Sequence, residues 1–191
     1  MYVETIIKNK KELEMSKFNV YQIKISDEIH NYVNQDDVGH VGGEKKYPIY
    51  EAHMRLRHSF GSNIDFKDDD FQHYTQVCEV KKDAGLTKGG ESWKIDDVET
   101  VFSLLNGSFY NEETEKDIVF DAHVSGYKTK ERIINGETRA LPDMHSLSVG
   151  DIVEDVDRSR FYIVAGFGFK EVTSEVWDYL VVELSEQREV N

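Results

Sequence analysis

The stretch MHSLSVGDIV at residues 144–153, followed by RFYIVAGFGF at residues 160–169, indicates a turn, a strand, a short acidic turn and a second strand. Gly150 supplies the backbone freedom that a turn or bulge needs where the first strand begins. The side chains of Ser148 and Asp151 are of the kind that bond turn amides. These features favour a structural turn over a ligand-binding loop.

Outward from this stretch, strands alternate with a few helices, which predicts an α+β fold: a mostly antiparallel sheet with a few short packed helices. We expect a single domain over residues 1–191, with a flexible arm or short helix at residues 1–17 and a mobile loop at residues 34–47. The other predicted elements are strands at residues 18–25, 71–82 and 117–124, a hairpin turning at Asn135-Gly136, and helices after Ser26, at residues 48–58 and at residues 95–106. The tail after Ser174 can be helix or strand, and helix is favoured.

The composition limits the class of protein. The 191 residues are 39% hydrophobic and 12% aromatic, which is enough for a packed core. A net charge of -14 keeps a chain soluble and repels nucleic acid and anionic membrane surfaces, so we expect neither partner. No apolar run approaches the roughly 18 residues of a membrane helix, and the N-terminus lacks a signal-peptide pattern. These features predict a cytoplasmic protein.

The single cysteine, Cys78, lies in the alternating run TQVCEV at residues 75–80. One cysteine cannot form an intramolecular disulfide, which fits a reducing compartment. Its position in a strand predicts a buried structural thiol rather than a reactive one.

The run LSVGDIV at residues 147–153, preceded by His145-Ser146 and followed by the strand with GFGFK at residues 166–170, resembles the YodL-like domain. The similarity covers roughly residues 71–172 and includes the upstream strand and the helix at residues 97–106. It leaves a long insertion at residues 109–143. The resemblance implies an origin in a phage or a conjugative or other mobile element and an accessory role. It supplies no catalytic residues.

Motifs that indicate catalysis or a cofactor are missing from the sequence. The seven histidines have no zinc-binding spacing, and the acidic run at residues 65–70 lacks the glycine and glutamate of a calcium loop. His123 and His145 each lie near an aspartate, Asp121 and Asp143, which leaves open an acid/base site. We therefore expect no cofactor and no metal, and we lean against an enzyme.

Acidic residues are concentrated in two places. Residues 91–121 hold nine acids and two lysines, a net of -7, and a second group begins at Asp151. Such carboxylates can imitate DNA phosphates, which recur every ~3.4 Å along a strand. The expected partner-binding residues are Asp96, Asp97, Glu99, Glu112, Glu113, Glu115, Asp151, Glu154, Asp155 and Asp157.

Charge and resemblance together predict an accessory protein that binds a host protein with a basic surface, in the cytoplasm of the bacterial host. It would act as a DNA mimic in counter-defence or in host takeover. Two alternatives stay open at this point. One is a small nucleotide-directed enzyme that uses His123 and His145, and the other is a virion or assembly component. A merely solubilising acidic surface is the plain alternative to a binding face.

Overall fold

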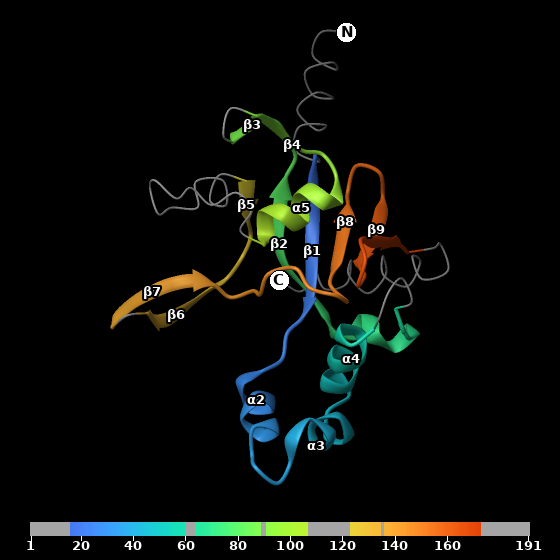
Figure 1. Cartoon of the computed structure of the whole chain (residues 1–191), viewed down its shortest axis with the longest axis vertical. Coiled ribbons are helices and arrows are strands. Elements are labelled where there is room, and N and C mark those ends of the chain that lie inside the picture. The colour runs from blue at the N-terminus through green and yellow to red at the C-terminus, as the bar shows by residue number, and fades with distance from the viewer. Residues whose placement is uncertain (1–15, 60–63, 89–90, 107–122, 135, 173–191) are drawn as a thin grey trace, which may run out of the picture. The chain divides into compact units, whose positions relative to one another are not determined.

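The computed structural model describes residues 16–59, 64–88, 91–106, 123–134 and 136–172 (Figure 1). It confirms the α+β fold, with a six-stranded, mostly antiparallel sheet in the order β10-β9-β8-β1-β2-β5 and two-stranded sheets β3-β4 and β6-β7. The strands are β1 (Lys17–Ile23), β2 (Tyr74–Lys81), β3 (Asp83–Lys88), β4 (Glu91–Ile95), β5 (Val124–Ser125), β6 (Thr129–Ile134), β7 (Glu137–Pro142), β8 (Ile152–Asp155), β9 (Arg160–Val164) and β10 (Phe169–Glu171). The helices are α2 (Asp27–Val33), α3 (Gly39–Lys46), α4 (Pro48–Arg57), α5 (Val98–Leu105) and the 3-10 helix η1 (Asp68–His73).

The chain divides into two compact units, and each is described by itself. The first unit contains the β3-β4 and β6-β7 sheets, α5 and β5, and the second contains α2, α3, α4 and η1. Their segments are Met1–Val20, Val77–Leu147 and Val153–Tyr162 for the first, and Tyr21–Gln76, Ser148–Ile152 and Ile163–Asn191 for the second. The single domain expected over residues 1–191 stays a prediction.

Strand β1 lies between β8 and β2 in the six-stranded sheet, so both of its edges are paired. Successive side chains of a strand point to opposite faces, and every residue from Phe18 to Ile23 is buried, so β1 is covered on both faces. Two of these residues are polar. Asn19 donates from Nδ2 to Glu154 Oε2 at 2.6 Å, and Gln22 donates from Nε2 to Asp151 Oδ2 at 3.0 Å. Both buried amides therefore hold an acidic side chain of the chain itself.

Helices α2 and α4 begin where the sequence predicted. The Ser26 hydroxyl accepts a hydrogen bond from the Ile29 amide at 3.3 Å, and Pro48 occupies the first turn of α4. Ile29, Val33 and Tyr50 form a buried cluster of the second unit. Ile29 and Val33 lie on α2 and Tyr50 lies on α4, so this cluster joins the two helices.

The mobile loop predicted at residues 34–47 is wrong, because this stretch contains α3. The prediction rested on Gly39, Gly42 and Gly43, which are poor helix formers. A Cβ at Gly43 would lie 2.3 Å from Val33 Cγ1 and 2.9 Å from the Tyr50 ring. Close packing against α2 and α4 therefore requires glycine here and stabilises a helix that local propensity disfavours.

Two predicted boundaries also shift. The strand expected over residues 71–82 begins at Tyr74, because the preceding residues form η1. The helix expected over residues 95–106 begins at Val98, since the Asp97 carboxylate accepts a hydrogen bond from the Thr100 amide at 2.8 Å and caps it.

Cys78 is buried, as predicted, and burial raises the pKa of its thiol to about 12.

The hairpin predicted at Asn135-Gly136 is confirmed as β6-β7, whose strands pair antiparallel from Thr129↔Pro142 to Ile134↔Glu137 (Figure 1). Gly136 has a φ of 84°, as a tight hairpin turn requires.

The predicted arm at residues 1–17 and strand at 117–124 lie largely outside the described residues, and the predicted tail element lies wholly outside them.

Candidate functional site

The motif that gave the family resemblance forms a tight turn between Ser148 and Asp151. The Asp151 amide donates to the Ser148 carbonyl at 3.0 Å, and the Ser148 amide donates to the Asp151 carboxylate at 2.8 Å. Gly150 has a φ of 93°, which a residue with a side chain rarely adopts. The Gly150 amide donates to Val164 at 2.9 Å. The predicted structural turn is therefore present, and it is anchored to the end of β9.

Asp151 supplies the carboxyl group of this turn, and its pKa lies far from its usual value. Its side chain is 5% exposed, and burial raises its pKa to about 8. Hydrogen bonds from the Ser148 amide and Gln22, together with the charge of Arg57, oppose that rise. The balance favours a neutral carboxyl group near pH 7. A perturbed and buried acid can mark a functional site, but this one is buried behind its hydrogen bonds with Gln22 and the Ser148 amide, whereas a partner-binding carboxylate must be exposed. Asp151 therefore leaves the expected partner-binding set.

The turn is also held from two sides within the second unit. Arg57 Nη2 donates to Ser148 Oγ at 3.1 Å, and the buried Tyr74 hydroxyl donates to the Gly150 carbonyl. Burial raises the pKa of Tyr74 well above its usual value, and the nearby charge of Asp151 adds to this rise. The Tyr74 hydroxyl therefore stays protonated and able to donate.

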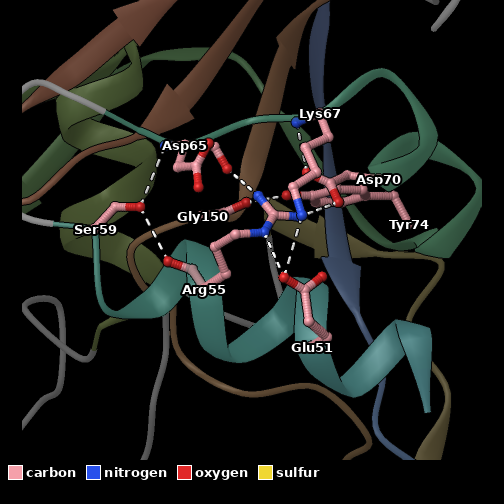
Figure 2. Close-up of polar contacts among 8 residues, drawn as sticks. All are labelled: Glu51, Arg55, Ser59, Asp65, Lys67, Asp70, Tyr74 and Gly150. Atoms are coloured by element: carbon pink, nitrogen blue, oxygen red, sulfur yellow. Dashed lines mark hydrogen bonds and ion pairs between the residues drawn. The ribbon is translucent and has the colours of Figure 1, made fainter. Parts of the chain in front are cut away.

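Figure 2 shows the network that surrounds Arg55 on α4. Arg55 Nη2 lies 2.5 Å from Asp70 Oδ1, and Nε lies 2.9 Å from Glu51 Oε1. Asp70 also accepts from the Lys67 amide at 2.8 Å, and Arg55 donates to the Asp65 carbonyl. The hydrogen bond from Arg55 lowers the pKa of Glu51. The network fixes η1 against α4, immediately before the strand that contains Tyr74.

Replacement of Arg55 by methionine should destabilise the protein. The Asp70 side chain is 3% exposed and would lose its cation, so we expect a loss of about 3 kcal/mol of unfolding free energy. Arg139→Met breaks an ion pair whose side chains are 56% and 71% exposed, and should cost under about 1 kcal/mol. Denaturant unfolding of both variants measures the difference. Equal stabilities would contradict the role assigned to Arg55.

The second acidic group of the sequence serves the fold. Asp155 is 1% exposed and lies 2.6 Å from Lys82 Nζ, and the same ammonium lies 2.7 Å from Asp157. Glu154 accepts from the buried Asn19 amide. Asp155 therefore leaves the expected partner-binding set together with Asp151. Glu154 and Asp157 reach the surface in part, but both bond residues of the first unit.

The first acidic group differs in its exposure. Asp96, Asp97 and Glu99 are exposed at the beginning of α5, whose opposite face is buried through Val98 and Val101. Asp97 caps the helix, whereas Asp96 and Glu99 form no ion pair with any described residue. Their acidic neighbours in the expected set, Glu112, Glu113 and Glu115, lie outside the described residues. The exposed carboxylates of α5 are the described residues that still fit a partner-binding face.

The one described pocket that contains either of the two candidate histidines contains only His145. His145 lines a pocket of about 260 Å³ in the first unit, and His123 is not among its lining residues. The residues that line the pocket are Leu105, Arg132, Leu141, Pro142, Met144, His145 and Ser146. Within the described ranges, no group of three or more His, Cys, Asp or Glu side chains is placed to hold a metal ion.

The cations of the hairpin were not among the predicted site residues. Arg132 on β6 and Arg139 on β7 lie directly opposite each other, and both are exposed. A signal for this pairing was present, because a two-residue turn at Asn135-Gly136 fixes every cross-strand partner by counting outward from it. The net charge of the chain is acidic, and it does not show that these two arginines lie side by side.

No family model matches this chain, and no curated protein or solved structure is significantly similar to it. Among the helices that the structure describes, none is long and apolar enough to cross a membrane.

Proposed function

We propose that this protein is a binding protein that docks a basic surface of a host protein onto the exposed carboxylates at the beginning of α5. The observation behind this proposal is the contrast between the two acidic groups. Asp155 and Asp157 are paired with Lys82, whereas Asp96 and Glu99 face solvent without a described counter-ion. Charges left uncompensated on a surface are available to a partner and steer its approach.

The setting that we propose is the cytoplasm of a bacterial host, with the protein encoded by a phage or a mobile element. The resemblance of residues 71–172 to the YodL-like domain supports this origin, and the net charge of -14 supports mimicry of DNA. The natural target of a DNA mimic is a basic groove of a nucleic-acid-handling protein. Counter-defence or host takeover would follow from occupying that groove.

Affinity capture from a bacterial lysate tests the proposal. Bound proteins are identified by mass spectrometry after washes at low and at high salt. Raising the salt from ~0.1 M to ~1 M shortens the screening length from ~10 Å to ~3 Å, so contacts between exposed charges should be lost. We expect one basic, nucleic-acid-handling protein that elutes with salt. Partners that all remain bound at high salt would contradict the charge mechanism.

A pair of charge-matched variants localises the contact. Asp96→Asn with Glu99→Gln should weaken capture about five- to thirtyfold, because each of the two exposed carboxylates contributes roughly 0.5–1 kcal/mol to a charged contact. Asp97 is left unchanged because it caps α5. The control, Asp36→Asn with Asp37→Asn, removes two exposed carboxylates elsewhere and should leave capture unchanged. Equal losses in both variants would show that total charge, and not α5, determines binding.

A further inference from the structure

The β6-β7 hairpin has one basic face. Residues that pair across the strands share a face, so Arg132, Arg139, Lys130 and Leu141 lie on the same side. Arg132 directly opposes Arg139, and like charges in such a pair repel each other. Arg139 pairs with Glu137 at 3.0 Å, whereas Arg132 forms no hydrogen bond or ion pair with another described residue. The repulsion is therefore only partly compensated within the described chain.

The hairpin is exposed on both faces. Glu131 and Ile133 point to the side opposite Arg132, and Ile133 is 78% exposed. A two-stranded hairpin is at best marginally stable in water without packing on a face. An exposed ribbon with gathered cations has the features of a docking arm, because a partner would both pack on it and neutralise its charge.

The pocket lies at the base of this same face. Arg132 and Leu141 contribute to its wall from the hairpin, and Leu105 and Met144 add apolar surface from the rest of the first unit. Its volume of about 260 Å³ is below the roughly 300–1,000 Å³ of pockets that hold drug-sized ligands. It suits a single apolar side chain with a cation beside it.

We propose that the basic face of the hairpin binds an acidic segment of a partner protein, and that an apolar side chain of this segment enters the pocket. Arg132 and Arg139 would each bind a carboxylate of the segment, and Leu141, Leu105 and Met144 would contact its apolar residue. Nucleic acid is the less suitable occupant, because the pocket wall is mostly apolar and offers phosphates no partner beyond the hairpin arginine and the polar groups of His145 and Ser146. This contact uses residues other than Asp96 and Glu99 at the beginning of α5.

An immobilised array of short peptides tests this proposal with the full-length protein. One set combines aspartate or glutamate with a single leucine or phenylalanine. A second set carries serine at the apolar position, and a third carries lysine at the acidic positions. We expect binding to the first set, with a loss of about tenfold in the second and of more in the third. A fluorescent DNA duplex is titrated in parallel.

Substitutions distinguish a specific effect of the hairpin arginines from a general effect of positive charge. Arg132→Ala with Arg139→Ala should weaken binding of the best peptide at least about tenfold, and Arg132→Lys with Arg139→Lys should recover part of it. The control, Lys45→Ala with Lys81→Ala, removes two exposed cations elsewhere and should leave affinity unchanged. Circular dichroism and thermal unfolding confirm that all variants are folded. Absence of binding to the acidic apolar set, equal effects of both alanine pairs, or arginine-dependent binding of the duplex alone would overturn the proposal.

Discussion

Replacement of Gly150 by alanine should destabilise the protein by about 4 kcal/mol, or prevent it from folding. Gly150 has a φ of 93°, where a side chain is strained, and an added Cβ would lie 2.9 Å from Leu56 Cβ. Leu56 is buried, so α4 would have to move away from the turn. Denaturant unfolding, or expression yield if the variant does not fold, measures the effect.

Gly136 provides the matched control. It has a φ of 84°, but a Cβ there would meet nothing within 4 Å. Gly136→Ala should therefore report the backbone strain alone, about 1 kcal/mol. The difference between the two variants gives the contribution of the close approach to Leu56. Similar losses at both positions would show that the turn is not packed against α4 as described.

Asp151 should lower the stability of the protein as the pH rises from about 4 to about 8. Burial raises the pKa of Asp151 to about 8 in the folded protein, whereas the unfolded chain loses this proton near pH ~4. Between these values the folded state binds more protons, so its stabilisation is full at low pH and is lost as the pH rises. Since one pKa unit corresponds to about 1.4 kcal/mol, the total is on the order of 5 kcal/mol.

Asp151→Asn should remove this dependence. The asparagine oxygen can still accept from Gln22 and the Ser148 amide, while the side chain stays neutral at every pH. We expect the variant to be more stable than the wild type above pH ~8 and similar to it near pH ~4. Asp36→Asn, at an exposed carboxylate, should leave the slope unchanged. Equal slopes in wild type and Asp151→Asn, from denaturant unfolding across this range, would contradict the buried acid.

Local signals predicted the parts of the fold that local chemistry determines. The hairpin follows from Asn135-Gly136, the start of α2 from the Ser26 cap, and the start of α4 from Pro48. Helix α3 was missed because its glycines disfavour a helix locally. Packing of Gly43 against Val33 and Tyr50 decides its structure, and those contacts join separate helices.

The sequence predicted the candidate binding surface only in part, because the ion pairs of the acidic residues depend on contacts between residues far apart in the chain. Counting acids along the chain located both acidic groups, but it did not show which of them have counter-ions. Lys82 is separated from Asp155 by 73 positions, and Gln22 from Asp151 by 129, so the burial of both acids depends on sheet pairing. In contrast, Asp96 and Glu99 follow a strand end and begin a helix whose apolar face is readable, so their exposure could be predicted from the sequence.

The most direct test of the proposed function is the dissociation constant of the captured host protein, measured against salt concentration for three purified proteins. These are the wild type, Asp96→Asn with Glu99→Gln, and the charge-matched Asp36→Asn with Asp37→Asn. We expect affinity to fall steeply with salt for the wild type and the control, and the α5 variant to bind more weakly with a smaller salt slope. An affinity that is independent of salt, or an α5 variant that matches its control, would contradict the proposed function.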